Sequence, residues 1–217
     1  MHSYKHTLKQ FIERYNAMQN NVGIIGELLF HIIIKMYFSN FRICSVLFNM
    51  ENRGFKNGYD VIIENLSNKE LITAEVKSGK KNENKDSNQT ISTLINDAKK
   101  DLNVRLNGSY DSLWIEAMNG FKKSISECDD DYDILKRIID GNYCKAVENK
   151  LDSTEQNVFL VGVLFNNTDD IFEEETISNI EKELSDAKIF KNVYIFAIQD
   201  NAYSEVIEFL LEESKNE

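Results

Sequence analysis

The chain has 217 residues, 42% of them hydrophobic, with a formal net charge of −11 and three widely spaced cysteines. This length and composition predict one globular domain, 1–217, and the cysteine spacing indicates neither a disulfide framework nor a zinc site. The apolar runs are too short to span a bilayer and no signal-peptide core opens the sequence, so we expect a cytoplasmic protein without membrane association.

Charge is divided unevenly along the chain. Residues 1–126 contain 17 Lys and Arg against 13 Asp and Glu, whereas residues 127–217 contain 8 against 23. Such an asymmetry predicts two surfaces with different partners. The acidic half repels DNA and suits a basic protein partner, although an acidic surface can also serve only to keep a protein in solution.

Two helices are predicted first, over residues 4–18 and 22–39. In the second, Glu27, His31 and Lys35 recur at i, i+4 and i+8. Their face is either a solvated polar stripe or the face that directs Glu27 at the hairpin described next. The residues expected to face the core are Ile24, Ile25, Leu28, Leu29, Ile32 and Met36. Gly23 and Gly26 would allow a close approach to a sheet.

A strand at 42–49 and a loop containing Arg53 and Lys56 lead to a predicted hairpin of strands 58–64 and 71–77. Alternation places Glu75 and Lys77 on one face and Val76 in the core. If the turn is Ser67-Asn68, paired residue numbers sum to 135 and Asp60 lies opposite Glu75, roughly 4.5–5.5 Å away at Cβ. Two carboxylates at that spacing can share one Mg²⁺ ion, but an exposed hairpin with a structural salt bridge has the same pattern.

Beyond the hairpin, a polar loop over residues 78–88 carries Lys80, Lys81 and Lys85, which can follow a phosphate backbone or remain simply solvated. The remaining elements are a helix at 89–104, a helical insertion at 106–151, buried strands at 157–165 and 193–198 around an acidic helix at 173–187, and a last helix at 202–213. The two continuous apolar strands are typical of a mixed or parallel sheet.

The pattern acid-x-Lys occurs at several other places, but only Glu75-x-Lys77 ends an apolar strand after an upstream Gly-x-Asp and a helical Glu. This combination resembles the PD-(D/E)XK nuclease superfamily. Three motifs are similar to those of the HamA nuclease subunit of the Hachiman antiphage defence system over about residues 22–105: Gly26-Glu27-Leu28-Leu29-Phe30-His31, Gly58-Tyr59-Asp60 and Glu75-Val76-Lys77.

The resemblance implies an α/β restriction-endonuclease-like core, a mixed central sheet flanked by helices, and Mg²⁺- or Mn²⁺-dependent hydrolysis of DNA. Asp60, Glu75 and the Val76 carbonyl would bind the metal, Lys77 would act on the attacking water or the phosphate, and Glu27 would align a second ion or a water. Nucleic-acid contacts are expected from Lys80, Lys81, Lys85, Arg53, Lys56 and His31.

The resemblance also implies a helicase subunit that holds the nuclease in check, and we expect the acidic half to contact it. Three alternatives remain open from the residues themselves. The chain can be a free-standing restriction or repair nuclease, an inactive module of the same fold that binds nucleic acid or protein, or a regulatory protein that acts through its acidic half.

Overall fold

A mixed β-sheet lies at the centre of the molecule. The structure, a computed structural model, describes residues 4–17, 22–46, 59–81, 84–167 and 169–215. These contain a five-stranded sheet in the order β1-β2-β3-β4-β5. Its strands are β1 (Phe41–Ile43), β2 (Val61–Asn65), β3 (Glu70–Lys80), β4 (Asn157–Phe165) and β5 (Asn192–Asp200). The first three strands are antiparallel and the last three are parallel, so the predicted mixed sheet is confirmed.

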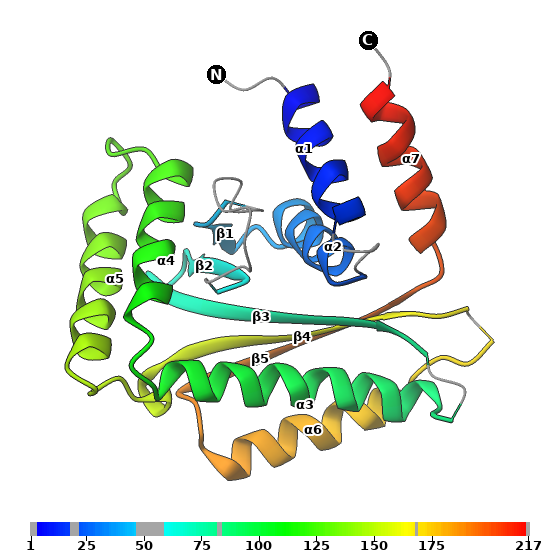
Figure 1. Cartoon of the computed structure of the whole chain (residues 1–217). Coiled ribbons are helices and arrows are strands. Elements are labelled where there is room, and N and C mark those ends of the chain that lie inside the picture. The colour runs from blue at the N-terminus through cyan, green and yellow to red at the C-terminus, as the bar shows by residue number, and fades with distance from the viewer. Residues whose placement is uncertain (1–3, 18–21, 47–58, 82–83, 168, 216–217) are drawn as a thin grey trace.

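Helices cover both faces of the sheet (Figure 1). One face carries α1 (Tyr4–Ala17), α2 (Val22–Tyr37) and α7 (Tyr203–Lys215), and the other carries α3 (Ser87–Leu106) and α6 (Glu174–Ala187). Strand β4 is buried along its whole length because it lies between these two layers, which is why it is apolar at successive positions. The predicted α/β class with flanking helices is therefore confirmed.

Helices α4 (Asp111–Ser124) and α5 (Tyr132–Val147) occupy the segment predicted to be a helical insertion. They stand at the end of the sheet formed by β1 and β2 (Figure 1). Their buried side chains, among them Trp114, Phe121 and Leu135, belong to the same core as α3 and the sheet. A short 3-10 turn, Ser153–Glu155, then leads into β4. None of the helices in the described part of the chain combines the length and apolar content needed to cross a membrane.

The hairpin has the predicted register, although its turn is longer than predicted. Val61 pairs with Ala74 and Asn65 with Glu70, so paired numbers sum to 135. The connection is the four-residue loop 66–69 and not a two-residue turn: Lys69 adopts a left-handed φ of 59° and its N–H donates to the Asn65 carbonyl. The predicted turn, 67–68, and the observed loop, 66–69, are both centred between residues 67 and 68, so the longer loop leaves the pairing register unchanged.

The two boundaries on either side of the loop after the hairpin differ from the prediction. Strand β3 continues through Ser78 and Gly79 to Lys80, because this polar end pairs with the apolar end of β4 as far as Phe165. Helix α3 then begins at Ser87 rather than at Gln89. Asp86 is its N-cap, and a capping box forms in which the Gln89 N–H donates to Asp86 while the Gln89 side chain accepts from the Asp86 N–H.

The buried face of α2 also differs from the prediction. Ile32 and Met36, expected in the core, are 42% and 67% exposed, whereas Phe30 and Ile34 are fully buried. His31, expected beside Glu27 on a polar face, is buried as well. Because α2 is apolar around most of its circumference, its pattern does not single out one stripe.

Candidate active site

Asp60 directly precedes β2 and lies beside β3, which extends beyond the first residue of β2. Its side chain is buried, and its Oδ2 accepts a hydrogen bond from the Val76 N–H at 2.7 Å. The carboxylate thus takes the place of a backbone acceptor from β2. In an antiparallel ladder the N–H and C=O of one residue point to the same neighbour, so the Val76 carbonyl also faces the edge that carries Asp60.

Glu75 projects from the opposite face of β3 from Val76, as the predicted alternation requires, and its side chain is 1% exposed. Its Oε1 accepts a hydrogen bond from Lys77 Nζ at 2.9 Å, and its Oε2 accepts one from Arg105 Nη1 at 2.6 Å. Burial and the neighbouring Asp60 raise the pKa of Glu75 to about 7, although Arg105 and Lys77 act against this rise. The carboxyl groups of Asp60 and Glu75 are therefore both buried and interact with each other, beside β3 where β2 begins.

Lys77 bridges two carboxylates. Its Nζ lies 2.9 Å from Glu75 Oε1 and 2.6 Å from Asp101 Oδ2. Burial acts to lower the pKa of Lys77, but Glu75 and Asp101 outweigh burial and hold that pKa above its ordinary value. Lys77 is consequently a charged ammonium at neutral pH, and it can donate hydrogen bonds but not accept a proton.

Two charged residues outside the predicted site, Asp101 and Arg105, are presented to the hairpin by α3. They are four residues apart on one helix, so they project from the same face, and they contact Lys77 and Glu75 respectively. The apolar face of this helix predicts the helix but does not show which of its polar residues meet the hairpin. The available signal was the i, i+4 spacing of an acid and a base on the helix that follows the Glu-x-Lys strand.

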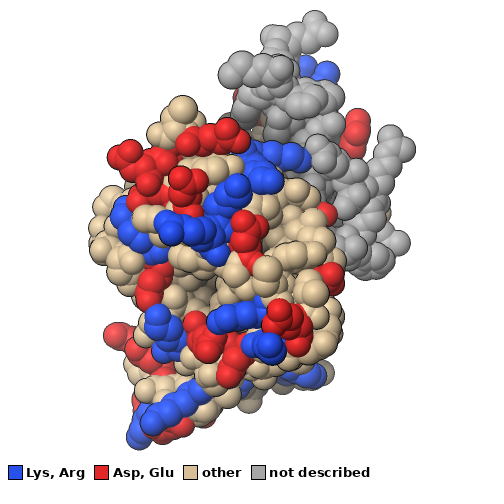
Figure 2. Space-filling model, turned by 90° about the vertical axis from the view of Figure 1, so that its left-hand side faces the viewer, with Lys and Arg blue, Asp and Glu red and all other residues tan. Residues whose placement is uncertain are grey.

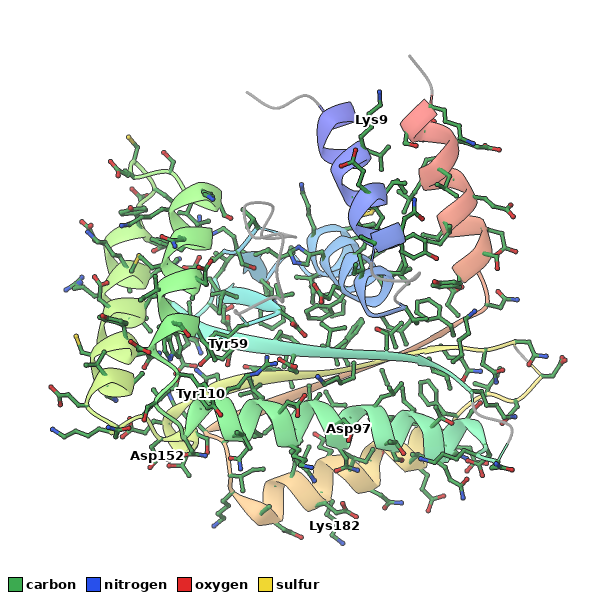
Figure 3. All side chains as sticks on the ribbon, in the orientation of Figure 1. Lys9, Tyr59, Asp97, Tyr110, Asp152 and Lys182 are labelled. Carbon is green, nitrogen blue, oxygen red and sulfur yellow. The ribbon has the colours of Figure 1, made fainter. Side chains whose placement is uncertain are left out.

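Tyr59 is a third residue of this region without a predicted role. Its ring packs against Trp114 of α4 with centroids 5.0 Å apart, and Figure 3 shows it beside β3 at the end of the sheet near α4. Among the described residues its buried hydroxyl has no hydrogen-bond partner. Burial raises the pKa of Tyr59 above its ordinary value, with Arg105 and Glu75 close enough to affect it, so the group remains a neutral donor.

Glu27 and His31 lie on α2, which covers the other face of the sheet from the one where Glu75 and Lys77 project. Gly26 lies directly against Ser78 of β3, as the close approach predicted for this glycine requires. The backbone at Glu27 is therefore next to the strand that carries the Glu-x-Lys motif. Within the described residues no three acidic, histidine or cysteine side chains form a group able to hold one metal ion.

The lysines predicted to contact nucleic acid lie farther along the chain. Lys80 ends β3, about 16 Å from Glu75 at 3.3 Å per residue, and its Nζ lies 4.6 Å from the centroid of the Tyr203 ring. Lys81 forms an ion pair with Asp170, and Lys85 donates to Thr93 Oγ1. Two further residues predicted to contact DNA, Arg53 and Lys56, lie outside the described residues.

The oxygen atoms of Asp60, Glu75 and Val76 are the kind of ligand that a hard divalent cation prefers. Asp60 and Glu75 offer carboxylate oxygens and Val76 a carbonyl oxygen, and Mg²⁺ commonly uses one or two carboxylates while keeping waters or a substrate phosphate as its other ligands. Both Glu75 oxygens already accept from a cationic side chain. A metal ion here would have to share Glu75 with Lys77 and Arg105 or replace one of them.

Comparison with known proteins gives the family of the chain. The HamA family model matches residues 2–213, far beyond the 22–105 over which the motifs suggested a resemblance. No curated protein and no solved structure matches the chain. The chain belongs to the HamA family and is accordingly a component of the Hachiman antiphage defence system.

Proposed function

We propose that this chain is a Mg²⁺- or Mn²⁺-dependent nuclease that hydrolyses phosphodiester bonds in DNA and is held in check by a partner helicase. The observation that carries the proposal is the convergence of buried Asp60 and Glu75 at one strand edge, with Lys77 beside them. Two carboxylates in one buried place destabilise each other unless a cation joins them. Family membership supports the setting in defence and the helicase partner.

Each residue has a separate task in this proposal. Asp60, Glu75 and the Val76 carbonyl would hold the cation, which when bound neutralises phosphate charge and lowers the pKa of water. Glu75 and Asp101 hold the pKa of Lys77 above its ordinary value, which favours a protonated hydrogen-bond donor over a general base. Lys77 would instead orient the attacking water through a hydrogen bond and offset the negative charge that develops on the phosphate.

The acids in the second half of the chain differ in how available they are to a partner. On the face of the molecule in Figure 2, Lys and Arg are interspersed with Asp and Glu. Two of the three acids at 129–131 are internally paired, Asp129 with Arg42 and Asp131 with Lys69. The acids at 173–175, where α6 begins, are exposed and remain available to a basic partner surface.

A cleavage assay on supercoiled plasmid tests the proposal. The chain is incubated alone and with the helicase of the same defence system, in Mg²⁺, Mn²⁺ or EDTA, and Lys77→Ala and Glu75→Gln are run in parallel. We expect metal-dependent nicking or linearisation that both variants reduce at least about 100-fold, since each removes a group that contacts the reacting phosphate or its cation.

Lys182→Ala is the matched control, because this exposed lysine of α6 carries the same charge as Lys77 away from the hairpin (Figure 3). It should cleave as the unmodified chain does. Cleavage that survives EDTA or Glu75→Gln would show that the metal site is assigned wrongly. Metal binding and DNA binding without cleavage, with or without the helicase, would favour the inactive module.

A further inference from the structure

Arg105 is bound far less completely than the other arginine that contacts a buried acid. Arg42 donates from Nε to Glu64 and from Nη1 to Asp129, and its Nη2 lies 2.5 Å from Glu64 Oε2 as an ion pair, so two buried or partly buried acids hold this guanidinium in place. Arg105 makes a single hydrogen bond among the described residues, from Nη1 to Glu75 Oε2, and its side chain is 29% exposed. A guanidinium has five N–H donors, so most of those on Arg105 are uncommitted.

The surroundings of Arg105 offer a second uncommitted donor. The Tyr59 hydroxyl is buried, lacks a hydrogen-bond partner among the described residues and interacts electrostatically with both Arg105 and Glu75. Asp101, one helical turn before Arg105, has a side chain that is 44% exposed, so the cluster is open to solvent along α3. Donors of this kind beside an open cluster are suited to an incoming anion.

Charge balance shows when the anion would bind. Among the described residues the cluster contains three carboxylates, on Asp60, Glu75 and Asp101, and two cations, on Lys77 and Arg105, so these five side chains sum to a formal charge of −1 when Glu75 is ionised. With a divalent cation held by Asp60 and Glu75 the sum would become +1, and Arg105 would be repelled from Glu75. One phosphodiester group then restores neutrality.

We infer that Arg105 is a phosphate-binding residue. Before the metal ion binds, Arg105 pairs with the Glu75 oxygen that the metal ion would use. After the metal ion binds, Arg105 and the Tyr59 hydroxyl donate hydrogen bonds to the substrate phosphate. This inference rests on the proposed function and deepens it. Arg105 is thus a competitor of the metal ion in the free protein and a ligand of DNA in the loaded one. Metal and DNA binding become positively coupled through one side chain.

Metal affinity without DNA gives the first test. Mn²⁺ binding is measured by calorimetry at pH 8.5, where Glu75 is ionised, for the full chain, Arg105→Ala, Glu75→Gln and the control Arg137→Ala, which removes an exposed arginine of α5. We expect Arg105→Ala to bind Mn²⁺ about tenfold more tightly, or ~1.4 kcal/mol. A residue that only supports Glu75 structurally would show the opposite sign.

DNA affinity gives the second test. Fluorescence anisotropy with a labelled duplex is measured in the Lys77→Ala background with EDTA and then with Mn²⁺. Adding Arg105→Ala should weaken DNA binding several-fold in Mn²⁺ and leave it unchanged in EDTA, whereas Arg105→Lys should retain part of the Mn²⁺-dependent affinity.

The outcomes separate this inference from the proposed function. If Glu75→Gln abolishes Mn²⁺ binding but Arg105→Ala leaves it unchanged or weakens it, the role of Arg105 is overturned and the metal site stands. If the full chain and Glu75→Gln bind Mn²⁺ alike, the metal site itself is overturned, and the role of Arg105 with it.

Discussion

Replacing Gly26 by alanine tests how closely α2 must approach the strand that carries Glu75 and Lys77. A Cβ at this position would lie 2.7 Å from Ser78 Cβ and closer still to Ser78 Oγ. The hydroxyl can rotate away, but the Ser78 Cβ is fixed by the strand. Since carbon atoms pack at about 3.5–4.0 Å, α2 would have to withdraw by roughly 1 Å.

Two opposing contributions set the expected change in the free energy of unfolding. Alanine is favoured over glycine within a helix by about 1 kcal/mol. Overpacking of a close contact costs about 1–3 kcal/mol, and the upper end applies because a backbone-anchored atom is involved. Gly26→Ala should therefore destabilise the protein by about 2 kcal/mol.

Urea denaturation with matched backgrounds measures this effect. In a Ser78→Gly background both clashing atoms are absent and the nearest remaining contact, Val163 Cβ at 3.5 Å, is ordinary, so Gly26→Ala should there stabilise by about 1 kcal/mol. The control is Gly141→Ala on α5, where nothing lies within 4 Å of the new Cβ and about 1 kcal/mol of stabilisation is expected. If Gly26→Ala alone stabilises as much as Gly141→Ala, then α2 does not depend on this close approach to β3.

Three further predictions follow from charged groups. Arg42→Ala leaves Glu64, which is fully buried, without its cation and should cost about 3–5 kcal/mol of stability in urea, with most of the loss recovered by adding Glu64→Leu. The pKa of Glu75 is raised to about 7 from 4.5, so its contribution to stability is fully present below pH 4.5 and lost as pH rises through 7. Metal-free wild type should consequently lose about 3 kcal/mol relative to Glu75→Gln between pH 4.5 and 8, and parallel pH profiles would contradict this. Association with the helicase should slow as salt rises and when the exposed acids at 173–175 are changed to lysine; salt-insensitive binding, or binding confined to residues 1–126, would exclude the acidic half as the contact.

The hairpin could be predicted from the sequence because its information is local. Alternation with period two fixes which face Glu75, Val76 and Lys77 share, and the centre of the polar connection fixes which residue opposes which. A turn of the wrong length with the right centre gives the same register. The strand ends could not be predicted this way, because Ser78, Gly79 and Lys80 become strand only through pairing with a segment more than eighty residues later.

The choice of buried face on α2 depended on packing that no local pattern contains. Its apolar residues surround the helix, so several stripes are equally hydrophobic. Gly26 decides among them: the position without a side chain permits the closest approach to β3, and Phe30 and Ile34, one and two turns on, follow it into the core. The exposure of Ile32 and Met36 is a consequence of that contact.

The position of Arg105 in the site depends on how far α3 returns along β3. From Ser87 to Arg105 the helix rises about 27 Å, more than the roughly 16 Å by which β3 runs on from Glu75 to Lys80, so its last turns can come back over the hairpin. A helix ending at Val104, as predicted, leaves Arg105 outside. The signal for a further turn was the spacing of Leu102 and Leu106, both fully buried, because an i, i+4 apolar pair continues the core-facing stripe. Continuing the helix through Leu106 places Arg105 one turn after Asp101. Asp101 then pairs with Lys77 of β3, and Arg105 pairs with Glu75 of the same strand.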